Sequence, residues 1–130
     1  MIVADASAII ELLLSTETGA MVAERVLDPT ETIHVPHLLD VEVAHALRRY
    51  ALSGTIGGEE GEDALDGLLA LPLHRYPHFS LLPRTWELRD SLSAYDAVYV
   101  ALAEFLSAPL VTADRRLAAA HGHRARVELI

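Results

Sequence analysis

Hydrophobic residues along the chain form two kinds of pattern: short unbroken runs and longer stretches with helical spacing. The short runs are typical of buried strands and occupy residues 2–4, 33–35, 73–76, 109–112 and 126–129. The longer stretches predict helices over residues 8–14, 17–27, 37–52, 55–71, 85–92, 93–106 and 114–120, with residues 77–83 as a loop. Ser7 is the predicted N-cap of the first helix, and Ser53-Gly54 is predicted to end the third.

Short strands that alternate with longer helices predict an α/β fold with a short, mainly parallel sheet. No linker, repeat or low-complexity segment interrupts the chain, so we expect one domain over residues 1–130. In folds of this class, functional side chains collect beyond the carboxyl ends of the strands, near the switch in strand order. Residues that directly follow the predicted strands are therefore the first candidates for a site.

Composition narrows the chemistry further. Hydrophobic residues make up 52% of the chain and charged residues 22%, which argues against disorder. No apolar run approaches the roughly 20 residues of a membrane-spanning helix, and the N-terminus lacks the basic segment of a secretory signal, so we expect a cytoplasmic protein. The absence of cysteine excludes disulfides, thiolate metal sites and a cysteine nucleophile. All ten basic residues are arginine, and the absence of lysine argues against P-loop NTPases, Schiff-base enzymes and aspartyl-phosphate enzymes.

Four acidic residues occupy positions where a solvated surface charge is not expected. Asp5 directly follows the first predicted strand, and Asp114 follows the fourth, each before a helix. Glu42 and Asp96 lie within helical segments whose neighbours are largely apolar. A carboxylate on an apolar helix face is unfavourable by several kcal/mol unless something compensates it, since lesser polar groups already cost about 2–7 kcal/mol.

Three of these acids also have a structural interpretation as helix caps. Asp5 and Asp114 stand where aspartate often caps a helix N-terminus. The segment Ser93-Ala94-Tyr95-Asp96 has the form of a capping box, with Ser93 as the cap and Asp96 at the third position. The two interpretations are compatible, because a helix N-terminus can direct a carboxylate into a site.

Bringing four carboxylates into one cleft is electrostatically unfavourable. Two unit charges about 4 Å apart repel by about 4 kcal/mol at an effective dielectric constant of about 20. Either the pKa values of the acids rise, or a cation neutralises the cluster. An all-oxygen ligand set without cysteine favours a hard ion, Mg²⁺ or Mn²⁺, and such ions commonly act on phosphate groups. The sequence therefore indicates phosphoryl or phosphodiester chemistry.

The four acids lie in segments that form a recognisable series along the chain. These are Val3-Ala4-Asp5-Ala6-Ser7, then Pro36 followed by Leu39-Asp40-Val41-Glu42-Val43, then Tyr95-Asp96-Ala97-Val98-Tyr99-Val100-Ala101-Leu102-Ala103, then Leu110-Val111-Thr112-Ala113-Asp114-Arg115-Arg116-Leu117. In this order and spacing they resemble the PIN-domain ribonucleases, and among them the VapC toxins of bacterial and archaeal toxin–antitoxin pairs. Each motif alone is weak, whereas four in register over nearly the whole chain are specific.

The resemblance implies a three-layer α/β/α domain with a mainly parallel sheet of about five strands. It also implies a Mg²⁺- or Mn²⁺-dependent endoribonuclease, with tRNA or rRNA as the expected substrate. It assigns catalysis and metal binding to the quartet Asp5, Glu42, Asp96 and Asp114. Ser7 and Thr112 match positions that orient the acids or a water. Members of the family usually form homodimers and are inhibited by a cognate VapB-type antitoxin, and we expect both partners here.

RNA binding has to overcome a formal net charge of −9, the opposite of what a simple nucleic-acid-coating protein shows. Four arginines lie close in sequence to the proposed site and are candidates for phosphate binding: Arg48, Arg49, Arg115 and Arg116. Surface salt bridges are their alternative role, and Glu42 has Arg49 and His45 within reach on its own helix. Stacking on RNA bases is one role open to Trp86 and the tyrosines, but with so few aromatic residues we expect them in the core or in a dimer interface.

Three other interpretations of the sequence stay open. A protein-binding module of the same fold would contain the acids without using them for catalysis. A different metal-dependent phosphohydrolase, such as a phosphatase or a DNA nuclease, would use the same donors, and recognition of the RNA 2′-hydroxyl leaves no motif in this sequence. A flavodoxin-like ligand binder would need a glycine-rich phosphate loop after the first strand, and Ala6-Ser7-Ala8 is not one.

Overall fold

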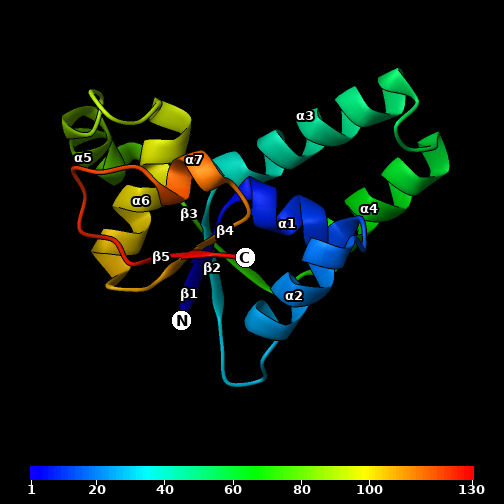
Figure 1. Cartoon of the computed structure of the whole chain (residues 1–130), viewed down its shortest axis with the longest axis horizontal. Coiled ribbons are helices and arrows are strands. Elements are labelled where there is room, and N and C mark those ends of the chain that lie inside the picture. The colour runs from blue at the N-terminus through cyan, green and yellow to red at the C-terminus, as the bar shows by residue number, and fades with distance from the viewer.

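A sheet of five strands forms the centre of the computed structural model, which describes residues 1–130 (Figure 1). The strands are β1 (Ile2–Ala4), β2 (Ile33–Pro36), β3 (Leu73–Tyr76), β4 (Leu110–Thr112) and β5 (Val127–Leu129). They lie in the order β3-β2-β1-β4-β5, and each of the four pairings is parallel. The predicted sheet is therefore confirmed in both the number and the direction of its strands.

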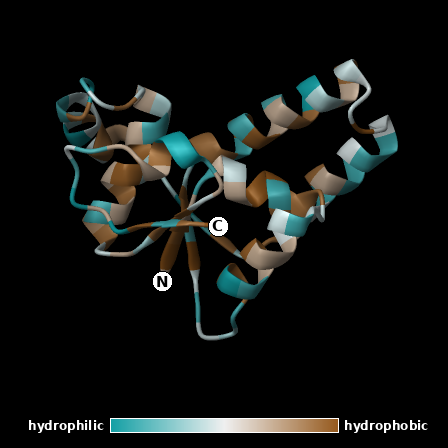
Figure 2. Cartoon of the chain, viewed as in Figure 1, coloured by the Kyte–Doolittle hydropathy of each residue, from teal (hydrophilic) through white to brown (hydrophobic).

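Helices cover both faces of the sheet and complete the three predicted layers (Figure 1). On one face, α6 (Ala94–Leu106) contacts β1 and β2, with α5 (Leu82–Glu87) packed outside it. On the other face lie α1 (Ala6–Leu13) and α2 (Glu17–Val26). The inner strands β1, β2 and β4 are buried along their whole length, which is why their sequences are short apolar runs without alternation. Figure 2 shows β1 and much of α6 among the most hydrophobic parts of the chain.

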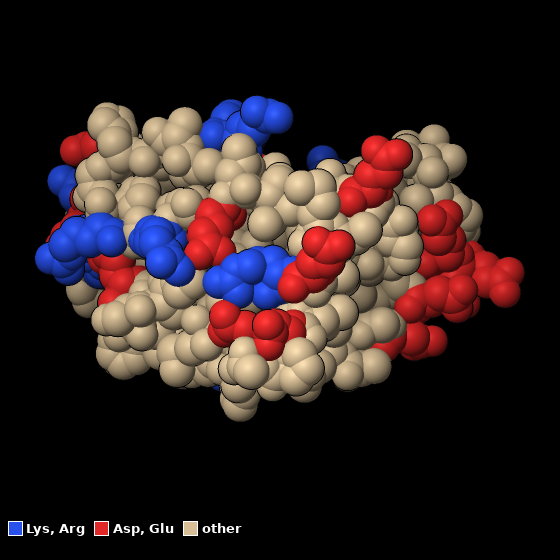
Figure 3. Space-filling view, turned by 60° about the horizontal axis from the view of Figure 1, so that its bottom comes forward, with Lys and Arg blue, Asp and Glu red and all other residues tan.

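Two further helices form an arm that projects from the sheet. They are α3 (Leu38–Ser53) and α4 (Gly58–Ala70), which pack against each other. Gly54 ends α3 with a φ of 76°, in the left-handed region that glycine enters without a steric penalty. The acidic N-terminal half of α4 is exposed, and acidic side chains gather at this end of the molecule (Figure 3). These acids are solvated surface charges outside the site described below.

The predicted bounds of local structure differ from those observed at three places. The predicted loop over residues 77–83 contains a 3₁₀ turn, η1 (Phe79–Leu81), and the start of α5. Pro83 is the second residue of α5, where its missing N–H leaves no helical hydrogen bond unmade. The helix predicted over residues 85–92 ends at Glu87, and the last helix, α7, is limited to Arg115–Ala118.

The strand order indicates where in the sheet a ligand site is expected. β1 lies between β2 and β4. From β1 the chain adds β2 and β3 on one side and then β4 and β5 on the other, so the strand order switches at the β1–β4 pair. The carboxyl ends of β1 and β4 meet there, in the kind of crevice where open α/β sheets bind ligands. No single helix of the fold is long and apolar enough to cross a membrane; α1 and α2 pass that test only as a pair, and they are bent by 111°.

Candidate active site

Asp5 follows β1 and is held on both carboxylate oxygens. Its Oδ1 accepts hydrogen bonds from Ser7 Oγ at 2.7 Å and from the Ala8 amide at 3.0 Å. Its Oδ2 accepts one from Thr112 Oγ1 at 2.6 Å. The residue is 5% exposed, and burial raises the pKa of Asp5 above its usual value of 3.8 even though all three hydrogen bonds lower it. An ionised carboxylate accepts about four hydrogen bonds, so roughly one lone pair stays free for a ligand.

The predicted cap of α1 is corrected by this geometry. Asp5, rather than Ser7, is the N-cap, because Asp5 has an extended backbone and its side chain accepts from the Ala8 amide. Ser7 lies inside the first turn, where its hydroxyl donates to Asp5 and accepts from the Ala113 amide at 2.9 Å. Asp5 is therefore both a helix cap and a residue of the cleft.

Ser7 and Thr112 join the turn after β1 to the turn after β4. Thr112 Oγ1 accepts from the Asp114 amide at 2.9 Å while its proton is donated to Asp5. Each hydroxyl has one proton, and both protons are used on Asp5, so the 3.2 Å approach of Ser7 to Thr112 is a contact without a donor. The prediction that these hydroxyls orient an acid agrees with their contacts to Asp5.

Asp96 and Asp114 lie at the N-termini of two helices. Ser93 caps α6 by accepting from the Asp96 amide at 3.2 Å, which confirms the predicted cap. Burial raises the pKa of Asp96 above its usual value of 3.8, and the nearby charge of Asp114 raises it further. Asp114 caps α7 by accepting from the Arg116 amide at 2.8 Å. In both cases the capping geometry leaves the carboxylate at the same end of the sheet as Asp5.

Glu42 reaches the same region from the first half of α3. Its Oε2 accepts a hydrogen bond from Tyr99 Oη at 2.5 Å, across the cleft from α6. Burial raises the pKa of Glu42 above 4.5, and the nearby charges of Asp96 and Asp5 act in the same direction. Burial and the bond to Glu42 also raise the pKa of Tyr99 above its usual value of 10.0, so this phenol stays a proton donor. The salt bridges proposed for Glu42 within its own helix do not form.

One cleft of about 650 Å³ brings all four acids together with Ser7. Apolar and aromatic side chains supply about half of its wall. Three of its carboxylates, those of Asp5, Glu42 and Asp96, have raised pKa values. Thr112 lies beneath this surface, fully buried, and acts on it through Asp5. The quartet predicted from sequence thus lines a single concave surface at the β1–β4 crevice.

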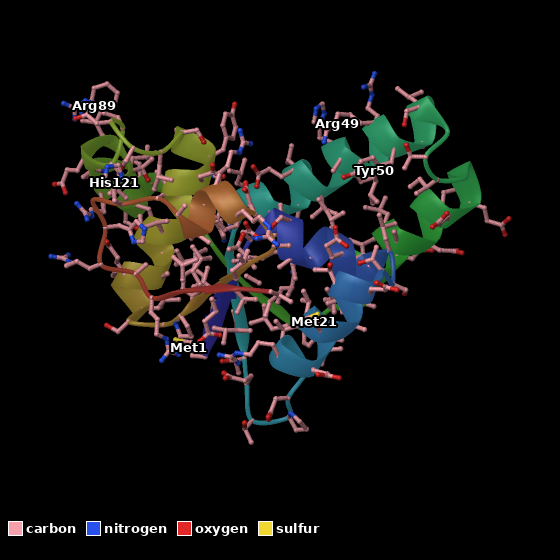
Figure 4. The ribbon with its side chains drawn as sticks, in the orientation of Figure 1. Met1, Met21, Arg49, Tyr50, Arg89 and His121 are labelled. Atoms are coloured by element: carbon pink, nitrogen blue, oxygen red, sulfur yellow. The ribbon has the colours of Figure 1, made fainter.

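The four arginines named as phosphate-binding candidates separate in space. Arg49 lines the cleft, on the projecting arm beside Tyr50 (Figure 4). Arg48 lines a different groove, between α3 and α4. Arg115 and Arg116 are exposed at the start of α7 and do not line the cleft.

Sequence reasoning missed several residues that line the cleft. They are Glu11, His45, Tyr50, Tyr95 and Tyr99. A signal was present for two of them: Glu11 lies four residues after Ser7, and Tyr99 lies three after Asp96, each on the same helix face. Tyr99 was assigned to the core because its neighbours are apolar, and it is indeed only 1% exposed. Its hydroxyl nevertheless reaches the cleft.

The donor set fits a hard divalent cation bound partly through water. No three acidic or histidine side chains converge closely enough to hold one ion directly. Mg²⁺ retains several waters and is commonly held by one or two carboxylates together with substrate phosphate. An all-oxygen cleft with raised carboxylate pKa values is suited to such binding, because a cation would relieve the repulsion among the acids.

Comparison with known proteins agrees with this geometry. The family model for the PIN domain matches residues 2–122. Ribonuclease VapC12 of Mycobacterium tuberculosis is 45% identical over 130 residues, covering 100% of this chain and 99% of the relative. The chain belongs to the VapC-type PIN-domain ribonucleases. Ribonuclease VapC9 of M. tuberculosis is 49% identical over 117 residues, which cover 90% of this PIN-domain chain and 88% of that protein.

A solved structure shows a similar fold. PAE2754 from Pyrobaculum aerophilum superposes with a TM-score of 0.70 at 25% identity, covering 96% of this chain and 81% of that one. The recognised family and the α/β/α architecture are thereby confirmed, whereas the individual roles of the four acids remain predictions.

Proposed function

We propose that this protein is a divalent-metal-dependent endoribonuclease toxin that cleaves RNA phosphodiester bonds in the cleft at the β1–β4 crevice. The observation that carries the proposal is the meeting of Asp5, Glu42, Asp96 and Asp114 in one cleft, where burial raises the pKa of three of them. Acids held this way in a structural role alone would be unfavourable. Binding of Mg²⁺ or Mn²⁺ offsets their charge.

The four acids have different tasks in this proposal. Asp5, Asp96 and Asp114 hold the cation directly or through water, and Glu42 completes that set or orients the attacking water. A bound divalent cation supplies an activated water and stabilises negative charge on the scissile phosphate. Asp5 is suited to rigid binding because three hydrogen bonds fix its carboxylate. Glu42 is suited to accepting a proton because burial raises its pKa and leaves Oε1 without a partner.

Substrate phosphates are bound by arginines around the cleft in this proposal. Arg49 is the strongest candidate, because it lines the cleft and forms no salt bridge. Arg115 and Arg116 are exposed next to Asp114 and are candidates for more distant phosphates. Arg48 is the weakest of the four, since it faces α4. The substrate class we propose is tRNA or rRNA.

We also propose a cognate VapB-type antitoxin, a homodimeric state and a cytoplasmic location. One structural neighbour, with a TM-score of 0.64 at 16% identity over 92% of this chain and 91% of that one, is a toxin–antitoxin complex from Klebsiella pneumoniae. Protein partners are also supported by an exposed apolar stripe on η1 and α5, where Phe79 is 87% and Trp86 68% exposed. Light scattering of the free chain tests the dimer, and co-expression with the antitoxin tests the inhibition.

The decisive experiment is cleavage of a total tRNA and rRNA pool by purified protein with Mg²⁺, with Mn²⁺ and with chelator. Asp96→Asn keeps the size of the side chain and the backbone amide that donates to the Ser93 cap. We expect discrete, metal-dependent fragments from the wild type and a loss of more than about 100-fold in Asp96→Asn, above the range for removing a group that only supports a ligand. Asp90→Asn is the matched control, since Asp90 is exposed and outside the cleft.

Uncut RNA in every lane from folded, antitoxin-free protein would contradict a general ribonuclease. Single-stranded DNA of the same sequence belongs in the experiment, because the acidic cleft by itself does not distinguish the two sugars. Equal cleavage of both nucleic acids would favour a nuclease without sugar selectivity.

A further inference from the structure

Glu42 is the one member of the quartet whose carboxylate is held from another helix. Asp5 is held by the turn after β1 and by Thr112 of β4, and Asp114 by the turn after β4. Asp96 lies in the first turn of α6, which Ser93 caps. Glu42 lies on the second turn of α3, and its only hydrogen-bond partner is Tyr99 of α6. A glutamate side chain has three rotatable torsions, so an unheld Glu42 would sample several positions in the cleft.

The tyrosine is well built to fix this carboxylate. Its ring is 1% exposed and packed in the core, and the hydroxyl at its tip emerges in the cleft wall. The 2.5 Å bond engages Oε2 alone and leaves Oε1 without a partner. The Tyr99 side chain, which has only two torsions, therefore determines which carboxylate oxygen of the more flexible Glu42 stays free to bind a ligand.

We propose, on the basis of the function proposed above, that Tyr99 is a positioning residue that holds Glu42 Oε2 and thereby presents Oε1 to the ligand in the cleft. Tyr99 does not itself act on the scissile phosphate. Its effect passes through Glu42, as groups behind metal ligands and bases commonly act, and loss of such a group typically costs 10- to 100-fold in activity or metal affinity. The same bond connects α6 to α3 across the cleft.

The test uses Tyr99→Phe, which removes the hydroxyl and keeps the buried ring. We expect kcat to fall about 10-fold or more with KM within about twofold, because the substrate still binds while Glu42 loses its orientation. In a Glu42→Ala background, Tyr99→Phe is expected to change kcat by less than about twofold, because the residue through which it acts is gone. Multiplicative losses in the double variant would overturn the proposal.

Tyr76→Phe is the matched control for general loss of stability. Tyr76 Oη also makes a side-chain hydrogen bond, to His34 Nδ1 at 2.7 Å, but on β3 and outside the cleft. Both variants are expected to unfold somewhat more easily, and only Tyr99→Phe to lose kcat. A loss of kcat in both, in proportion to stability, would reduce Tyr99 to a structural role.

A crystal structure of metal-free Tyr99→Phe separates this inference from the proposed function. We expect the Glu42 carboxylate to leave its wild-type position or to occupy several positions. An unchanged, well-ordered Glu42 would overturn the inference whatever the activity measurements show. Wild-type protein that cuts no RNA would instead refute the proposed function, and the position of Glu42 would still decide the role of Tyr99.

Discussion

Arg48 and Arg49 are adjacent in sequence, yet α3 turns them toward different surfaces. Arg49 lines the acidic cleft, whereas Arg48 lines the groove between α3 and α4. Successive residues of an α-helix point about 100° apart, so adjacent positions can face different surfaces, as these two arginines do. The pair therefore offers two variants with the same change in net charge and different distances from the site.

We expect Arg49→Ala to raise the KM for RNA about 10-fold, the effect of losing one charge-assisted hydrogen bond to phosphate. The dependence of binding on salt should also become shallower by about one unit in the log–log slope. Arg48→Ala is expected to change KM by less than about twofold. Steady-state kinetics at several salt concentrations check both values, and equal effects of the two variants would show that only net charge matters.

Thr112 and Thr85 are two buried threonines with opposite hydrogen-bonding states. Thr112 Oγ1 donates to Asp5 and accepts from the Asp114 amide, whereas Thr85 Oγ1 has no partner. Thr112→Val should cost about 1–3 kcal/mol in the free energy of unfolding, because both partners lose a hydrogen bond, and should reduce kcat through Asp5. Urea denaturation and cleavage assays measure the two effects.

Thr85→Val is the control for the methyl-for-hydroxyl exchange. Its stability should stay unchanged or rise by up to about 1 kcal/mol, because an unsatisfied buried hydroxyl is replaced by an apolar group of the same shape. Destabilisation by both exchanges to the same degree would contradict the hydrogen-bond argument.

Local signals in the sequence predicted the sheet and the positions of Asp5 and Asp114, whereas the resemblance to the PIN-domain ribonucleases implied that Glu42 and Asp96 join them. Asp5 and Asp114 each follow a short apolar run, and two parallel strands that pair bring their carboxyl ends together. Asp96 stood out because a charge in an apolar helix is unfavourable unless a function or a cap requires it. Such signals need no knowledge of contacts between distant segments.

The rest depended on contacts that a sequence does not contain. The bond from Tyr99 to Glu42 joins residues 57 positions apart, and a tyrosine among apolar residues gives no sign of where its hydroxyl points. The alternative considered for Glu42 was a pairing within α3, because intrahelical spacing can be read from sequence and a partner on α6 cannot. The loop predicted before Pro83 failed because proline is equally suited to a loop and to the first turn of a helix.

Glu104 and Glu87 share one arginine and differ in burial. Arg84 donates to Glu104 from Nε at 2.7 Å and to Glu87 from Nη1 at 2.9 Å, while the glutamate side chains are 7% and 64% exposed. The Arg124 amide also donates to Glu104 at 2.7 Å. Glu104→Ala is therefore expected to cost about 2–3 kcal/mol in the free energy of unfolding, and Glu87→Ala less than about 1 kcal/mol.

The Glu104 contribution also has a defined pH dependence. Its bonds to Arg84 lower the pKa of Glu104 below 4.5, so the stabilisation is present above that value and is lost as the pH falls through the lowered pKa. Urea denaturation at neutral and acidic pH should show the gap between wild type and Glu104→Ala narrowing in acid. A gap that stays constant would mean that packing, rather than charge, accounts for the loss.

His34 is expected to make the fold less stable in mild acid, far from the cleft. Its ring nitrogens contact the hydroxyls of Thr32 and Tyr76, and its ring stacks on His74 with centroids 4.7 Å apart. Burial lowers the pKa of His34 below 6.5, and the charge of His74 lowers it further. The unfolded chain then binds more protons in this range, so the contribution is complete above pH 6.5 and is lost as the pH falls through the lowered pKa.

The raised pKa values of Asp5, Glu42 and Asp96 have the opposite effect on the free energy of unfolding. The folded chain binds these protons more tightly than the unfolded chain, so this contribution to stability grows as the pH falls. The stability of the wild type as a function of pH is therefore the sum of these two opposing effects. The difference between wild type and His74→Ala isolates the effect of the histidine pair. We expect the urea midpoint of His74→Ala to fall less than that of wild type between pH 7.5 and about 5.5, because His34 then protonates with less repulsion. The exposed His121 has no ring neighbour, so the urea midpoint of His121→Ala should vary with pH as that of the wild type does. Urea midpoints that vary with pH in the same way in all three proteins would mean that the His34–His74 stack contributes no pH dependence.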